Sequence, residues 1–192
     1  MAEQLALPEA VVNSIEYAAR WHDEGKRDPR FQAMLHGGNQ FAAELAPEPL
    51  AKSGMDPADR AAFRIAWQRS KYPAGMRHEA LSSQILRRQL EVFPPDNTVD
   101  DELITHLVAS HHGRSRPLLP AVVDDDPQLV DREELGTFDT SQTIDWEAPR
   151  RFAYLNERYG YWGLALCEAI LRLADQNASA APDLGAEDDD TA

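Results

Sequence analysis

Cysteine is almost absent from this sequence. Cys167 is the only one among 192 residues, so the chain can form neither an intrachain disulfide nor a zinc site built on cysteines. Any metal would therefore be held by histidines and carboxylates. The sequence also lacks an uncharged apolar run of the roughly 18 to 20 residues that a membrane span needs, and its first ten residues show no basic segment followed by an apolar one. We expect a soluble, cytoplasmic protein with no membrane contact.

Basic residues are scarce compared with acidic ones. Lys and Arg total 19 against 33 Asp and Glu, which gives a formal net charge of -14, and a uniformly acidic surface would repel nucleic acid. The acids are concentrated, however. Residues 183–192 hold five acids and no base, and residues 124–145 hold eight acids against Arg132 alone, which leaves a net charge of only -2 elsewhere. We expect a long acidic surface loop, a disordered acidic tail at 183–192 and a body that can still bind anions.

Alternation of apolar and polar residues, as in a strand, is missing as well, whereas residues that begin and end helices recur along the chain. Apolar residues at helical spacing, bounded by capping residues, proline or glycine, predict six helices. They cover residues 8–25, 28–37, 56–73, 77–93, 98–113 and 149–175. In the first of them Gly25 is expected as a left-handed C-terminal cap. Residues 42–56 are predicted as loop or weak helix and 114–148 as a surface excursion, so the fold class is all-α with one domain over residues 1–182.

Histidines on the apolar faces of these helices carry the chemistry. A single such histidine is most often a hydrogen-bonded core residue. Several occur together here, with carboxylates beside them: His22, Asp23, His78, His111, His112 and Asp175. Burying so many titratable groups without compensation would cost several kcal/mol apiece, which favours a metal centre. Imidazoles and carboxylates suit Mn, Fe, Co, Ni or Zn, and a carboxylate such as Asp23 can bridge two ions.

The two remaining histidines are predicted to lie outside this centre. His106 lies roughly 140° round its helix from His111, and His36 abuts the Gly37–Gly38 helix stop. We expect both at the surface.

Four motifs, in order and spacing, resemble the HD phosphohydrolase superfamily. They are HDEGKRDPRFQ from His22, RHEALSSQIL from Arg77, the double histidine followed by Gly113, and LADQNAS from Leu173. More narrowly, they resemble the HD nuclease domain of the CRISPR-associated helicase-nuclease of type I interference, over residues 10 to 180.

The resemblance implies a compact helical bundle that binds up to two divalent ions and cuts single-stranded DNA. It implies a superfamily 2 helicase as partner and recruitment by an RNA-guided surveillance complex. In this scheme Asp23 bridges the ions, His78, His111 and His112 complete one of them, and His22 and Asp175 serve the other. Mn, Ni, Co or Fe is expected, and Mg is possible.

Positive charge near these ligands has two interpretations. Lys26 would face the scissile phosphate, or it is an exposed lysine that follows a helix cap. Five arginines near the proposed ligands would form a basic rim, or they are scattered over the surface: Arg27, Arg30, Arg77, Arg114 and Arg116.

One departure from the family pattern leaves alternatives open. The family normally supplies a further histidine from a helix upstream of the His-Asp motif, and residues 1–21 contain none. We therefore expect that the chain begins inside the domain and that the ion at His22 and Asp175 is held weakly. The alternatives are a phosphohydrolase acting on mononucleotides or cyclic nucleotides, and an inactive docking domain depleted of metal.

Overall fold

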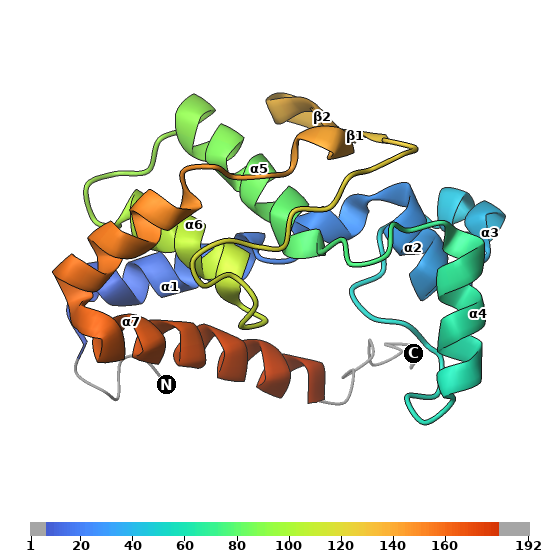
Figure 1. Ribbon diagram of the computed structural model, residues 1–192, viewed down its shortest axis with the longest axis horizontal. Coiled ribbons are helices and arrows are strands. Elements are labelled where there is room, and N and C mark those ends of the chain that lie inside the picture. Colours follow the sequence, from blue (N-terminus) through green and yellow to red (C-terminus); the bar gives the residue numbers. More distant parts are fainter. Residues whose placement is uncertain (1–6, 181–192) are drawn as a thin grey trace, which may run out of the picture.

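The computed structural model describes residues 7–180, and helices dominate it (Figure 1). The α-helices are α1 (Glu9–Trp21), α2 (Pro29–Leu35), α3 (Gln40–Leu45), α4 (Arg60–Ser70), α5 (His78–Val92), α6 (Asp101–Ser110) and α7 (Ala148–Ala180). Short 3-10 turns are η2 (Glu24–Arg27), η3 (Glu133–Leu135) and η4 (Thr140–Gln142). The predicted all-α class is confirmed. None of the helices in the described part of the chain is long and apolar enough to cross a membrane.

The core forms where α1, α5, α6 and α7 meet, with α6 between the other three (Figure 1). Every residue of α6 from Leu103 to Ser110 is buried, so this helix has no solvent-facing side beyond its first turn. The single cysteine, Cys167, is a core residue of α7. Each fully buried Leu or Ile of this cluster stabilises the fold by about 1.5–3 kcal/mol. This packing holds the ends of the four helices in place.

Two helix starts differ from their predicted positions. Helix α4 begins at Arg60, because the carboxylate of Asp59 accepts hydrogen bonds from the first backbone N–H groups, while the predicted cap Asp56 accepts only from Ala58 in the preceding turn. Helix α6 is capped by Asp100 instead of Thr98. Several Asx residues in a row all fit the capping pattern, and only the backbone path selects one of them.

Helix α7 consists of two parts. Gly160 adopts φ 70° and ψ 159°, a conformation that favours glycine, and the helix axis changes direction there. The second part, from residue 161 onward, runs along one side of the bundle (Figure 1). It carries Asp175 toward the ends of α1 and α6.

The segment between α6 and α7 holds structure that the sequence did not predict. Strands β1 (Leu129–Arg132) and β2 (Gly136–Asp139) form an antiparallel hairpin with Val130 opposite Phe138. Both of these side chains pack against Leu81 and Ile85 of α5. Strands of four residues are too short to show a convincing alternation, which explains why no strand was expected.

The acidic stretch 124–145 is anchored to the body rather than solvated throughout. Arg30 Nη2 lies 2.8 Å from an oxygen of Asp28 and 2.8 Å from an oxygen of Asp124, and all three side chains are buried. Asp145 is also buried and lies 2.6 Å from Arg151. The expected acidic surface loop is therefore buried at these two positions. The predicted tail at 183–192 lies outside the described residues.

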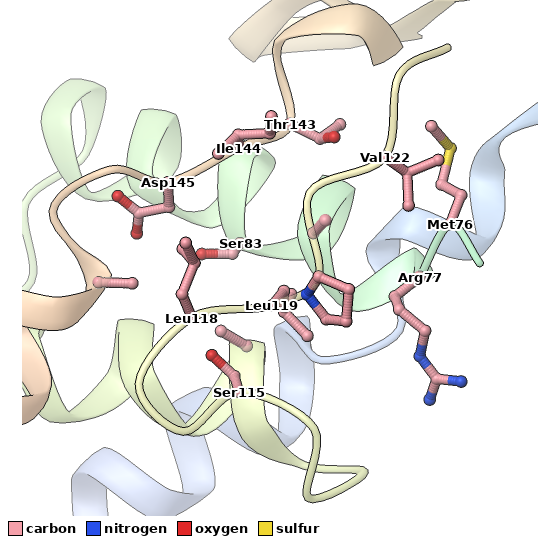
Figure 2. A pocket seen from close by; sticks show the side chains of 14 residues that line it. Met76, Arg77, Ser83, Ser115, Leu118, Leu119, Val122, Thr143, Ile144 and Asp145 are labelled. Atoms are coloured by element: carbon pink, nitrogen blue, oxygen red, sulfur yellow. The ribbon is translucent and has the colours of Figure 1, made fainter.

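Apolar side chains hold the first part of the same segment against α5. Figure 2 shows Leu118, Leu119 and Val122 around a small pocket whose other walls include Met76 and Ile144. The chain from α6 to the hairpin is thus fixed beside the start of α5, where His78 lies.

Candidate metal centre

All six predicted metal ligands come together where four helices meet. His22 directly follows α1, His78 is the first residue of α5, and His111 directly follows α6. The remaining three are His112, Asp23 at the start of η2, and Asp175 on α7. A helix C-terminus carries partial negative charge, and the C-termini of α1 and α6 both end at this centre, so their fields favour a bound cation.

The carboxylate of Asp23 lies in the middle of the cluster. Its Oδ1 is 3.3 Å from His78 Nε2 and 4.0 Å from His111 Nε2. Its Oδ2 is 3.4 Å from His22 Nε2. Each oxygen therefore faces a different part of the histidine set, as a carboxylate between two cations would.

The histidines form two overlapping groups. His78, His111 and His112 can each offer one ligand atom within 4.8 Å of the others, and so can His22, Asp23 and His111. Asp175 Oδ1 lies 3.4 Å from His22 Nε2, which places it beside the second group. The structure thus separates His78 and His112 from His22 and Asp175, with Asp23 and His111 between them.

Backbone carbonyls fix which ring nitrogen of these histidines faces the centre. His22 Nδ1 donates to the carbonyl of Ala19, and His111 Nδ1 donates to that of Val108, both at 2.8 Å. Because Nδ1 carries a hydrogen in each ring, the lone pair of the neutral ring lies on Nε2 and points at Asp23 and its neighbours. Metal-binding histidines are oriented in the same way, by a hydrogen bond from the nitrogen that does not bind the ion.

The charge states of the cluster also suit a cation. Burial, together with the neighbouring His78 and His112, lowers the pKa of His111 to about 3, so this ring is neutral at neutral pH and its Nε2 is free to bind. Burial alone would raise the pKa of Asp23. The hydrogen bond with His78 and the charges of His22 and Lys26 outweigh it and hold the pKa well below its usual range, so Asp23 stays ionised.

A divalent metal fits these residues. The buried Nε2 of His22 has no hydrogen-bond partner among the described residues, and it faces carboxylate oxygens that cannot donate to it. The Nε2 atoms of His78 and His111 are 3.3 Å apart. Such closely placed nitrogens and carboxylate oxygens need positive charge between them, which a proton supplies in the hydrogen bond of His78 with Asp23. A divalent cation can take the place of such protons, and imidazole with carboxylate suits divalent transition metals.

Gly25 brings the Asp23 turn against α5. Its N–H donates to Ser82 Oγ at 2.8 Å, and a Cβ at this position would lie 2.0 Å from the carbonyl oxygen of His78. The expected left-handed cap is wrong, because Gly25 lies within η2 and lacks a positive φ. This contact was not predicted from the sequence, in which its only sign is a glycine two residues after Asp23.

Glu79 is a second residue that the sequence analysis missed. Its buried carboxylate accepts from Arg77, and its Oε2 lies 3.4 Å from His78 Nδ1. Burial opposes ionisation, but the adjacent His78 and Arg77 outweigh it and lower the pKa of Glu79. An acid that follows a proposed ligand directly, with an arginine before it, was the available sign.

Lys26 is held beside Asp23. Its Nζ donates to Asp23 Oδ2 at 2.7 Å and to the carbonyl of Ala51 at 2.9 Å. Gln32 binds the backbone of Leu50, so the segment 47–51 is fixed as one wall of a cavity that His22, Asp23 and Lys26 also line. Lys26 therefore lies inside the site with a carboxylate partner already in place.

His106 is not a surface residue. It is buried, and its Nε2 lies 2.7 Å from Glu168 on α7, whose other oxygen accepts from Arg116. It belongs to neither ligand group. His36 also lies outside both groups and is half-buried.

Of the two interpretations of the five arginines, the basic rim does not hold for four of them. Each of them has an acidic partner, and Arg114 alone of the five is exposed without a recorded ion pair within residues 7–180. The partners are Glu24 for Arg27, Asp28 and Asp124 for Arg30, Glu79 for Arg77, and Glu168 for Arg116. Their charges are largely compensated inside the protein.

One family of known proteins matches nearly the whole chain. The family described as "Cas3, HD domain" matches residues 1–179, a range that contains every candidate ligand. No curated protein and no solved structure matches the chain significantly. HD domains bind divalent metals, and this family is one of CRISPR-associated HD nucleases. The chain therefore belongs to the family of Cas3 HD domains.

Proposed function

We propose that this protein is a metal-dependent nuclease that hydrolyses phosphodiester bonds of single-stranded DNA in type I CRISPR interference. The observation that carries the proposal is the Asp23 carboxylate, whose two oxygens face His78 and His22 on different helices. In this proposal the protein acts in the cytoplasm beside a superfamily 2 helicase and is recruited by an RNA-guided surveillance complex. Membership of the Cas3 HD family supports these partners.

Six residues would hold up to two divalent ions. Asp23 would bridge them, His78, His111 and His112 would complete one, and His22 and Asp175 would serve the other. Mn, Ni, Co or Fe suits this mixture of imidazole and carboxylate, and Mg is possible. The two ligand groups in the structure support this division, with His111 close to both.

Each side chain has a defined task in hydrolysis. When bound, divalent ions activate water and neutralise charge on the phosphate, and they need no side-chain nucleophile. The backbone carbonyls of Ala19 and Val108 keep His22 and His111 in the tautomer that presents Nε2. Lys26 adds positive charge beside Asp23, on the cavity side where a phosphate would enter.

Selectivity for single strands follows from the depth of the centre. His111 is fully buried, and segment 47–51 forms a wall beside His22 and Asp23. A flexible strand can bend into such a cavity, whereas a duplex is too wide and too stiff to do so.

The experiment is a metal and cleavage titration of the chelator-treated protein. We expect added Mn²⁺, Co²⁺ or Ni²⁺ to bind by calorimetry and to restore cleavage of a labelled single-stranded oligonucleotide but not of the duplex. Asp23→Asn should weaken metal binding at least 10 to 100-fold and remove cleavage, with an unchanged circular dichroism spectrum. Asp125→Asn, an exposed acid far along the chain, is the matched control.

Three results would contradict the proposal. Full divalent-dependent cleavage by Asp23→Asn would remove this residue from the site. Hydrolysis of cyclic or mononucleotides without cleavage of DNA would favour a nucleotide phosphohydrolase. Absence of metal binding in the unmodified protein would favour a docking domain.

A further inference from the structure

A groove runs along one face of α7 and ends at Arg172, one helical turn before Asp175. Near the centre it is lined by His111, Gly113 and Arg172. Farther along it is lined by Phe152 and the adjacent Tyr161 and Trp162. The two parts share Arg116, Ala165 and Glu168, so together they form one path from Arg172, which is one helical turn before the proposed ligand Asp175, to an aromatic pair.

Helical spacing confirms that this path follows a single face of α7. Tyr161, Ala165, Glu168, Arg172 and Asp175 occur at i, i+4, i+7, i+11 and i+14, which is one stripe of an α-helix. The stripe is about 20 Å long at 1.5 Å per residue. Its far end carries aromatic rings, and its near end carries the proposed ligand Asp175.

The aromatic end of the groove is open to solvent. Trp162 is 89% exposed and Tyr161 is 75% exposed. Rings of this size contribute strongly to a core when they are buried, so two adjacent exposed ones contribute little to this fold. Exposed aromatic rings beside a groove are the platform on which unpaired bases stack.

The near end of the groove carries a cation without an acidic partner. Arg172 is exposed and makes no hydrogen bond or ion pair within residues 7–180, and its Nη1 lies 3.3 Å from the position that a Cβ on Gly113 would occupy. The one acid that lines this groove, Glu168, already accepts from Arg116 and contacts His106. The guanidinium beside the metal centre is therefore the free charge of the groove.

We propose that this groove binds the single-stranded nucleic acid on one side of the bond that is cut, with Arg172 on a phosphate next to the metal centre and Tyr161 and Trp162 stacked on bases farther out. The inference rests on the proposed function. The free guanidinium of Arg172, one helical turn before the proposed ligand Asp175, favours a nucleic acid over a protein partner, since a patch built for protein docking has no need to end beside a metal ligand.

The test measures binding without catalysis, so that it does not depend on the proposed cleavage. A fluorescent oligothymidylate is titrated with the whole 192-residue chain in chelator, and binding is followed by anisotropy at several salt concentrations. We expect Tyr161→Ala and Trp162→Ala each to weaken binding by roughly 5-fold or more. Arg172→Gln should weaken binding and reduce the slope of log K against log salt by about 0.7, the value for one phosphate contact on a single strand.

Matched controls lie outside the groove. Trp146→Ala removes another exposed tryptophan and Arg88→Gln another exposed arginine, and both should bind the oligonucleotide like the unmodified protein. Photocrosslinking of oligonucleotides that carry 5-iodouracil gives a second readout, with adducts expected at Tyr161 or Trp162.

The outcomes separate this inference from the proposed function. If the unmodified protein binds metal and cleaves DNA while the groove variants bind and crosslink like it, the groove proposal is overturned, and the exposed rings remain as a surface for a protein partner. If the unmodified protein binds DNA but no metal, and the groove variants bind DNA more weakly, the groove proposal stands and the proposed function fails.

Discussion

At the scale of single residues, the six histidines fall into different environments. His22, His78, His111 and His112 surround Asp23 with ligand atoms close together, whereas His106 is paired with Glu168. A buried histidine with one carboxylate partner stabilises structure, while a cluster of histidines facing one carboxylate is costly without a cation.

Substitution of His78 and His106 should separate these two roles. His78→Gln removes a proposed ligand, so metal affinity by calorimetry should fall at least 10 to 100-fold while the helical spectrum is retained. His106→Gln leaves Glu168 with a poorer partner, so the free energy of unfolding should fall by about 1–3 kcal/mol with metal affinity retained. Equal loss of metal in both variants would show that the ligand set is wrong.

The two ions should differ in affinity. The group at His78 supplies three imidazoles beside Asp23, whereas the side at His22 and Asp175 has one imidazole of its own and shares His111. We expect calorimetry and elemental analysis to find one tightly bound ion and a second that binds only in excess metal. Two equally tight ions would contradict this assignment and would require a further ligand, for which His36 is the first residue to test.

That the candidate ligands come together could be predicted from sequence, because motif order and helix phase both mark them. The burial of His106 could not be predicted. Its position in the helix places it about 140° from His111, which is correct, but this angle does not tell whether the opposite face of the helix meets solvent. Helix α6 is surrounded by α1, α5 and α7, so its other face is buried as well. The number of neighbours around a helix is a property of the tertiary fold.

At the scale of elements, the site depends on the close approach of η2 and α5. Gly25→Ala would place a Cβ 2.0 Å from the His78 carbonyl oxygen, and only a movement of backbone can relieve that overlap. We expect the free energy of unfolding to fall by about 1–3 kcal/mol, together with metal affinity, since Asp23 moves with the turn. Gly54→Ala is the control, because a Cβ there meets no atom within 4 Å. Retained stability and metal affinity in Gly25→Ala would refute this packing.

The connection between α2 and the acidic segment should be sensitive to acid. The hydrogen bond with Arg30 lowers the pKa of Asp124 below its ordinary 3.8, despite burial, so this carboxylate stabilises the fold above that pH and the stabilisation is lost as the pH falls through the lowered value. Asp124→Asn should lower the free energy of unfolding at neutral pH by about 3–5 kcal/mol and flatten its fall below pH 3.8.

Chemical denaturation across pH measures this effect. Asp125 is adjacent to Asp124 and exposed, so Asp125→Asn is the control and should be as stable as the unmodified protein. An unchanged stability of Asp124→Asn at neutral pH would mean that the buried network does not hold the segment.

The longer helices were predicted well because each repeats its pattern over several turns, whereas the six-residue α3 and the hairpin were not predicted as such. Val130 and Phe138 are the buried residues of the hairpin, and they are covered by α5, which is more than forty positions earlier in the chain. The segment between α6 and α7 is rich in Asp and Thr, which suggested that it is exposed to solvent. The sequence does not show that Arg30 lies opposite Asp124 and buries it.

At the scale of the whole molecule, metal binding should be coupled to stability. The proposed ligands come from the ends of α1, α5 and α6 and from α7, so a bound ion would connect the four helices of the core. Metal at 100 times its dissociation constant should raise the free energy of unfolding by about 2.7 kcal/mol. Thermal unfolding with Mn²⁺ and with chelator measures this shift, and a shift of the same size in Asp23→Asn would contradict the site.

The carbonyl contacts of His22 and His111 have a consequence for protein design. Each histidine lies just past a helix end and donates Nδ1 to the carbonyl three residues before it, so the helix itself supplies the acceptor that selects the tautomer. A helix C-terminus of this kind can be used in a designed protein. In a designed bundle with two such C-termini facing each other, both histidine rings would present Nε2 to the ion, and both helix dipoles would attract it.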